Sequence, residues 1–182
     1  MRCLRGVFLL IVPGVLACGA PAAQDEEPEV AAALLPAELE DAAWATAWTD
    51  LACAEVARGK LSPPVAARVY AYLGLALYEG TAGVRRPSLA GRVRGYDAPA
   101  TPRGRIDEPL AMTEAARQVL AALLGDGAAQ AIGDLATTQQ QARRAQVSRR
   151  VQQRSLAYGQ AVAAAVLARA AADGFAQRGE HA

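Results

Sequence analysis

The side chains that most often perform acid–base, nucleophilic or metal chemistry are scarce in this chain. Its one histidine, His181, stands next to the last residue, where an imidazole is poorly placed for catalysis or metal binding. The sequence contains no phosphate-binding glycine loop, dinucleotide-binding glycine motif, paired-cysteine metal spacing or serine nucleophile motif. We therefore expect the chain to hold no catalytic, cofactor-binding or metal-binding residues.

The three cysteines have different expected roles. Cys3 lies in the apolar N-terminal stretch that we expect, from the pattern described below, to be removed as a leader, and Cys18 stands at the end of that stretch. Cys53 then remains as a single thiol, which cannot form an internal disulfide. Because Cys53 lies among apolar residues of a helical pattern and no base can be assigned to it, we expect it to be a small core residue.

The charge pattern argues against a nucleic-acid partner. The net charge of +1 produces no overall field that would draw the chain to nucleic acid or to an anionic surface. The basic pairs Arg143-Arg144 and Arg149-Arg150 are surrounded by glutamines, without aromatic residues on which bases could stack. We interpret these arginines as a solvated helix face.

The first residues have the three parts of an export signal. Arg2 and Arg5 give a positive start, and an uncharged apolar run follows from Gly6 to Ala17. This run is shorter than the roughly 20 apolar residues that span a bilayer. We therefore expect residues 1–18 to be an export signal that directs the chain to the cell envelope.

The signal ends in Val15-Leu16-Ala17-Cys18-Gly19, which resembles the lipobox of bacterial lipoproteins. The resemblance implies that Cys18 becomes the N-terminus and carries a lipid that anchors the chain to a membrane. The alternative is ordinary cleavage near Ala20 or Ala23, which leaves a soluble secreted protein. Residues 19–35 contain prolines and an acidic stretch, so we expect them to form a flexible tether.

Residues 36–182 are expected to form one all-α domain, a bundle of about five helices without strands. Apolar side chains recur every three or four residues, and serine, proline and glycine stand near the helix ends. The predicted helices are Pro36 to Arg58, Pro63 to Glu79 after the cap Ser62, Pro109 to Leu124, Ala128 to Ala145, and Arg149 to Asp173 after the cap Ser148.

The second helix has the broadest apolar face, which Tyr70 and Tyr78 widen, so we expect this helix to be central. Arg68 and Glu79 are the charges inside it, and we expect them to contact neighbouring helices or carbonyls. In the fifth helix, alanines at three- and four-residue spacing predict a close approach to a neighbouring helix. These are Ala157, Ala161, Ala164, Ala165, Ala168 and Ala172.

A long segment, Gly80 to Glu108, separates the second and third predicted helices. It contains five glycines and six arginines but little apolar periodicity. Loops of this length are uncommon in compact domains and are often functional. Two interpretations remain open, a contact surface in its own right or a connection that packs against a neighbour absent from this chain.

Three stretches of the chain are similar to a known family. The most specific is LSPPVAARVYAYLGLALYE at Leu61 to Glu79, and the others are Trp44 to Leu51, and Tyr158 to Ala168 with Asp173-Gly174. They resemble bacterial vanadium-dependent haloperoxidase-like lipoproteins, in the superfamily that includes type 2 phosphatidic acid phosphatases and bacterial acid phosphatases. The resemblance implies an all-helical fold in which vanadate or phosphate binds among arginines, a lysine and two histidines. In such pockets, positive groups neutralise the oxyanion and histidine serves as nucleophile or metal ligand.

The catalytic motifs of that family are absent here. Its first motif is a lysine, then six residues, then Arg-Pro; with Arg86-Pro87 as the Arg-Pro, the lysine would stand at Glu79. Its Pro-Ser-Gly-His motif matches only Pro87-Ser88, and the histidine of its Ser-Arg-x5-His motif would replace Ser155 after Ser148-Arg149. No catalytic or vanadate-binding residue can therefore be transferred to this chain, although the family is enzymatic.

Two functional hypotheses follow. In the first, the chain is the N-terminal scaffold segment of a haloperoxidase or acid-phosphatase-like exported lipoprotein. It is then an incomplete part of a larger helical fold, inactive without a C-terminal catalytic bundle, and is expected to expose apolar helix faces. In the second, it is a stand-alone helical lipoprotein, a binding or structural module whose arginine-rich loop is the contact surface.

Overall fold

The structure, a computed structural model, describes residues 36–82 and 86–176, with side chains from Ala42 onward. The expected export signal, Cys18, the tether and His181 lie outside the described residues. The chain divides into two units at Ala33–Leu34, and all the described helices lie in the second, Leu34–Ala182.

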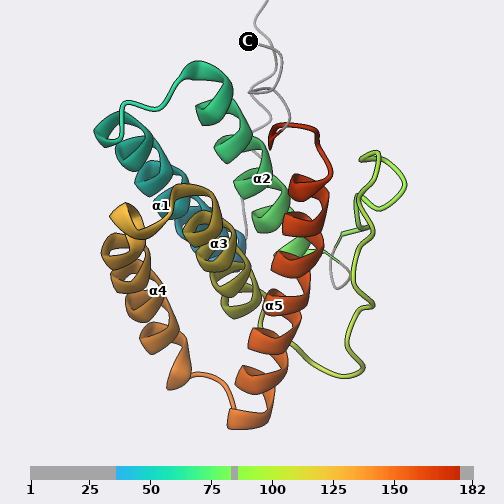
Figure 1. Ribbon diagram of the computed structural model, residues 1–182. Coiled ribbons are helices and arrows are strands. Elements are labelled where there is room, and N and C mark those ends of the chain that lie inside the picture. Colours follow the sequence, from blue (N-terminus) through green and yellow to red (C-terminus); the bar gives the residue numbers. More distant parts are fainter. Residues whose placement is uncertain (1–35, 83–85, 177–182) are drawn as a thin grey trace, which may run out of the picture. The chain divides into compact units, whose positions relative to one another are not determined.

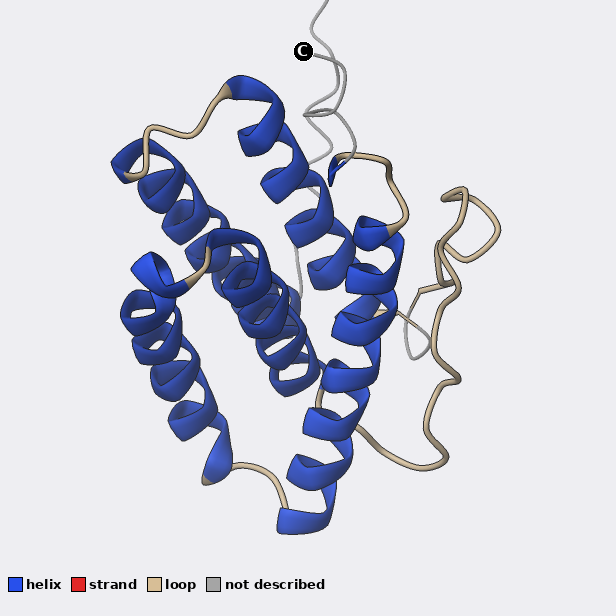
Figure 2. Cartoon of the chain, in the orientation of Figure 1, coloured by secondary structure: helices blue, strands red, loops and turns tan. Residues whose placement is uncertain are grey.

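The described residues form five α-helices and one short 3-10 helix, and they contain no strand (Figures 1 and 2). The helices are α1 (Pro36–Arg58), α2 (Pro63–Thr81), α3 (Glu108–Leu124), η1 (Asp126–Ala128), α4 (Ala129–Arg144) and α5 (Arg149–Ala171). The predicted all-α class and the order of the five helices are confirmed. Of the described helices, none combines the length and hydropathy that a membrane-spanning segment requires.

Capping side chains mark where two of the helices, α3 and α5, begin. Asp107 precedes α3 and accepts a hydrogen bond from the Leu110 backbone N at 3.2 Å. Ser148 caps α5 as predicted, accepting from the Val151 backbone N at 3.4 Å. Ser62 occupies the expected position before α2, but its side chain makes no capping bond. The two prolines in the first turn of α2, which need no N–H partners, therefore mark that start more firmly than the serine does.

The Leu34–Ala182 unit has two apolar cores, to which α2 and α3 both contribute. The first core is formed by α2, α3 and α5 and includes Ala111, Val119 and Val162. The second is formed by α1 to α4 and includes Trp48 and Leu73. Because α2 contributes to both cores, the prediction that it is central is confirmed. The helix α3 is more enclosed than α2, since all of its first nine residues, 108–116, are buried.

Two glycines allow α2 and α5 to approach α3 closely. A Cβ atom on Gly80 of α2 would lie 2.6 Å from the Cα of Met112, and one on Gly159 of α5 would lie 2.4 Å from the carbonyl oxygen of Ala111. Both distances are far below van der Waals contact, so any side chain at either position would push the helices apart. Glycine is therefore needed at both crossings.

The alanine stripe predicted for the α5 contact is wrong. Ala165 is half-buried, and the other five alanines are exposed: Ala157, Ala161, Ala164, Ala168 and Ala172. The buried face of α5 is Ser155, Tyr158, Gly159, Val162, Ala163, Val166 and Ala170. Burying a tyrosine and two valines removes more apolar surface from water than burying alanines, and this difference sets the rotation of the helix.

Cys53 and Tyr70 are both exposed, which contradicts the core position expected for Cys53 and the inward position expected for Tyr70. Cys53 is a free thiol, and 38% of the Tyr70 surface is accessible. On α1 the buried residues Trp48, Ala52 and Val56 form the inner face, and Cys53 lies about 100° around the helix from Ala52, the middle residue of that face. The apolar neighbours of Cys53 in sequence therefore did not imply burial.

Candidate functional site

The segment between α2 and α3 packs on the helices of its own chain. We call residues 86–107 the arginine loop. Figure 1 shows that it runs beside α5. Tyr96 and Ile106 are buried in the first core, and Leu89 and Val93 pack against that core. One of the two interpretations left open by the sequence was that this segment packs against a neighbour absent from the chain. These four apolar residues need no such neighbour, because the first core already covers them.

Glu79 holds the beginning of the arginine loop. Its side chain is fully buried, and its carboxylate accepts hydrogen bonds from Ser88 Oγ at 2.8 Å and from the Leu89 backbone N at 2.6 Å. A carboxylate can only accept hydrogen bonds, so two donors from the loop offset part of the cost of burying it. The predicted contact of Glu79 with helices or carbonyls is wrong, because its partners are a hydroxyl and an N–H of the loop.

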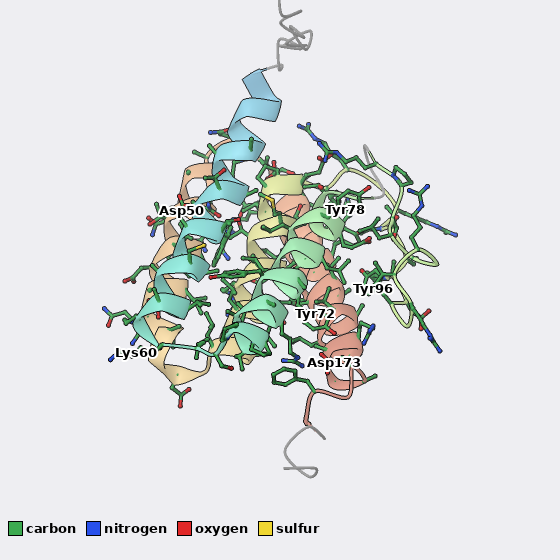
Figure 3. The ribbon with its side chains drawn as sticks, turned by 90° about the horizontal axis from the view of Figure 1, so that it is seen from above. Asp50, Lys60, Tyr72, Tyr78, Tyr96 and Asp173 are labelled. Carbon is green, nitrogen blue, oxygen red and sulfur yellow. The ribbon has the colours of Figure 1, made fainter. Side chains whose placement is uncertain are left out.

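Two tyrosines lie beside this carboxylate. Tyr158 of α5 donates its hydroxyl to the Ala82 carbonyl at 3.1 Å, with the Glu79 carbonyl at 3.3 Å. The buried Tyr96 hydroxyl lies near the Glu79 carboxylate without meeting the geometry of a hydrogen bond, and Figure 3 shows this ring at the loop. Burial, followed by the negative charge of Glu79, raises the pKa of both phenols. Neither tyrosine can therefore act as a base near neutral pH.

α5 binds the arginine loop along its length through backbone groups. Arg169 donates to the Arg94 carbonyl and Arg154 to the Arg105 carbonyl, each at 2.7 Å. At the end of the loop, the Asp107 backbone N donates to Ser155 Oγ, also at 2.7 Å. The loop is thus hydrogen-bonded to α5 at these three places, to Glu79 and Tyr78 of α2, and to Arg143 of α4.

The two basic pairs at the end of α4 and the start of α5 form only in part the solvated helix face that the sequence predicted. Arg144, Arg149 and Arg150 are exposed, but the Arg143 side chain is 16% exposed and forms an ion pair with Asp107, which is 4% exposed. This bidentate pair joins the C-terminus of α4 to the N-cap of α3. Sequence spacing could not reveal it, because 36 positions separate the two residues.

Arg68 joins the start of α2 to the end of α5, as expected for a charge inside α2. Its Nε donates to Asp173 Oδ2 and its Nη2 to the Ala170 carbonyl, both at 2.7 Å. The guanidinium lies 5.3 Å from the ring centre of Tyr72 and 5.0 Å from that of Phe175, and Tyr72 also donates its hydroxyl to Asp173. Tyr72 and Asp173 are seen close together in Figure 3. The cluster closes one end of the α2–α5 interface.

The pKa shifts of two carboxylates predict lower stability in acid. Burial alone would raise the pKa of Asp173 and of Glu114, but hydrogen bonds outweigh it and lower both pKa values, chiefly those from Arg68 to Asp173 and from Arg117 to Glu114. A carboxyl whose pKa is lower in the folded state stabilises the fold above its unfolded pKa, and this contribution disappears as the pH falls. We therefore expect the free energy of unfolding to decrease as the pH drops below the ordinary values of 4.5 and 3.8.

Urea unfolding at a series of pH values measures this effect. In the variant Arg68→Gln, the Asp173 carboxyl loses its main partner, so stability should depend less on pH below about pH 4 than it does in the unaltered chain. An identical pH dependence in both proteins would contradict the role assigned to the Arg68–Asp173 pair.

The polar side chains of these clusters bind one another or the backbone. In the described part of the chain, no three His, Cys, Asp or Glu side chains lie close enough to hold a metal ion. The Glu79 carboxylate, which the sequence sets against the lysine of the first motif, accepts its hydrogen bonds from Ser88 and Leu89. Ser88 and Ser155, at the positions of the other two motifs, bind Glu79 and the Asp107 backbone. These residues hold the loop in place.

Sequence reasoning missed a second buried polar cluster, centred on Gln139 of α4. Its side-chain Oε1 accepts from Trp48 Nε1 at 2.8 Å and from Thr113 Oγ1 at 2.7 Å, which joins α1, α3 and α4. The sequence did not distinguish Gln139 from the other glutamines of α4, so its burial could not be predicted.

Comparison of the chain with protein-family models, with curated proteins and with solved structures found no match.

Removing the charge of Glu79 tests its role in holding the loop. In Glu79→Gln, an NH2 group replaces one of the two accepting oxygens and faces a donor of the loop. We therefore expect the free energy of unfolding to fall by about 1–3 kcal/mol. Hydrogen exchange at the Leu89 amide should become much faster. The matched control is Asp97→Asn, which removes an exposed carboxylate from the same loop and should change stability by less than about 0.5 kcal/mol. Unchanged protection of the Leu89 amide in Glu79→Gln would refute this role.

Proposed function

We propose that this chain is the non-catalytic N-terminal scaffold of an exported lipoprotein of the vanadium-haloperoxidase and acid-phosphatase type. In this proposal, Cys18 carries the lipid that anchors the protein to a membrane of the cell envelope. The helices of the Leu34–Ala182 unit provide a surface on which a C-terminal catalytic bundle packs. That bundle supplies the residues that bind vanadate or phosphate.

One observation supports this proposal above the others. The stretches that carry most of the family resemblance contact each other at both ends; they are Leu61 to Glu79, and Tyr158 to Ala168 with Asp173-Gly174. Arg68 pairs with Asp173 at one end, and the Tyr158 hydroxyl lies against the Glu79 carbonyl at the other. Residues of the two resembling stretches therefore hold α2 and α5 together, and this supports a structural role for both stretches.

An activity measurement tests the proposal. The purified 182-residue chain should neither oxidise bromide with vanadate and hydrogen peroxide nor hydrolyse a phosphate ester, because a lone histidine cannot supply both imidazoles. The DNA after the Ala182 codon should encode Pro-Ser-Gly-His and Ser-Arg-x5-His motifs. Turnover by the isolated chain, or a stop codon in an intact gene, would refute the scaffold assignment.

A second candidate, the stand-alone helical lipoprotein, is favoured by a different observation. A fragment was expected to expose apolar helix faces, but Tyr70 is the one exposed large hydrophobic side chain among the described residues. Most of the buried apolar side chains belong to the two cores. A monomeric domain that binds no hydrophobic dye, together with a stop codon after Ala182, would support this module. Dye binding or self-association would count against it.

A further inference from the structure

The charges of the Leu34–Ala182 unit are unevenly distributed, although the net charge of the whole chain is only +1. The arginine loop and α5 together contain nine arginines, whereas their acidic residues are Asp97 and Asp107. Asp107 is buried and paired with Arg143. The exposed surface of the arginine loop and α5 therefore has a large excess of positive charge.

Most arginines elsewhere in the described unit have carboxylate partners. Arg58, Arg68, Arg117 and Arg143 each form an ion pair. In the arginine loop, Arg92, Arg94, Arg103 and Arg105 are exposed, and none of them pairs with an acid in the described part of the chain. Their charge is available to a partner outside the molecule.

The contacts of α5 place further guanidinium groups beside these loop arginines. Arg169 and Arg154 bind the carbonyls of Arg94 and Arg105, and a neutral carbonyl leaves the charge of each guanidinium uncancelled. Since 15 residues separate Arg154 and Arg169, the two contacts lie about 22 Å apart along the helix. We call Arg92, Arg94, Arg103, Arg105, Arg154 and Arg169 the arginine strip. In Figure 3, nitrogen-tipped side chains project outward from the loop, away from the helices.

We propose that the arginine strip docks this domain on a membrane surface that contains anionic phospholipid headgroups. Guanidinium groups bind phosphate oxygens through paired hydrogen bonds and lose little hydration when they do so. A row of several such groups, about 22 Å long, matches an extended array of phosphates better than it matches a single small anion. The strip exists whether the chain is a scaffold segment or a stand-alone module, so this proposal does not depend on the family resemblance.

A lipid surface explains the strip better than a nucleic acid does. Proteins that bind single-stranded nucleic acid combine basic residues with exposed aromatic rings on which bases stack. The aromatic ring of the arginine loop, Tyr96, is instead buried in the first core. A lipid on Cys18 would also bring this unit close to a bilayer, an argument that rests on the proposed function, whereas the arginine strip itself does not.

Vesicle flotation tests the proposal with the Leu34–Ala182 unit, whose two cores are contained within it. The unit should bind vesicles of phosphatidylcholine with about one third phosphatidylglycerol and should not bind pure phosphatidylcholine. Binding should weaken as the salt concentration rises. The triple variant Arg94→Gln, Arg103→Gln, Arg105→Gln should bind about a hundredfold more weakly, because each basic residue at an anionic surface contributes about fivefold.

A matched triple variant separates the strip from net charge. Arg58→Gln, Lys60→Gln, Arg144→Gln removes the same charge from other parts of the surface and should change binding less than about threefold. Thermal unfolding should show that both triple variants remain folded, since all the replaced side chains are exposed. Equal losses in the two triples, or no binding to anionic vesicles at low salt, would overturn the proposal. Tighter binding to single-stranded DNA than to anionic vesicles would overturn the choice of a lipid partner.

Discussion

Replacing Gly159 by alanine is expected to destabilise the domain by about 2–3 kcal/mol, although alanine is the better helix former. The new Cβ would lie 2.4 Å from the Ala111 carbonyl oxygen and 2.9 Å from the Glu114 Cβ. One of these neighbours is backbone of the enclosed helix α3, so relief requires the whole of α5 to move. Thermal unfolding measures the effect, which should appear as a decrease in Tm of roughly 5–10 °C.

Two other glycines provide the control for this variant. At Gly74 in α2 and Gly133 in α4, a Cβ atom would meet no other atom within 4 Å, and both glycines lie inside helices. Gly74→Ala and Gly133→Ala should therefore each stabilise the domain by about 0.5–1 kcal/mol through helix propensity alone. A Gly159→Ala variant as stable as these two would show that α3 and α5 do not approach as closely as described.

Replacing Trp48 by alanine is expected to cost about 3–5 kcal/mol, the largest effect of any substitution considered for α1. The indole is fully buried in the second core, and its Nε1 donates to Gln139 Oε1 at 2.8 Å. The substitution leaves a cavity and removes one of the two donors to that oxygen. Urea unfolding should show a lower midpoint with little change in slope.

Phenylalanine separates the hydrogen bond of Trp48 from its volume. Trp48→Phe keeps most of the ring, and Gln139 Oε1 still accepts from Thr113, so the expected loss is about 1–2 kcal/mol. The same change at Trp44 is the control, because Trp44 is only half-buried and contacts Gln139 through its carbonyl rather than its indole. Equal effects of the two phenylalanine variants would contradict the role of Gln139 in joining α1, α3 and α4.

The candidate site was predictable only in part. The sequence placed Arg68 and Glu79 inside a helix and led us to expect structural contacts there. For Arg68 the expected type of partner was correct, since it binds a carbonyl of α5. For Glu79 it was wrong, because the loop that supplies its donors has no regular pattern from which contacts can be read. The Gln139 cluster, which depends on three helices meeting, gave no local signal at all.

The sequence by itself determined the all-α class and the ends of the helices, because apolar periodicity and end signals act over a few residues. It could not determine which face of α5 is buried or that Cys53 is exposed, since those depend on which side chains the neighbouring helices offer. Tertiary structure alone decided the pairing of Asp107 with Arg143, the burial of α3, and the gathering of loop and α5 arginines on one face. Each of these features depends on contacts between residues far apart in the chain, and such contacts form only once the helices have packed.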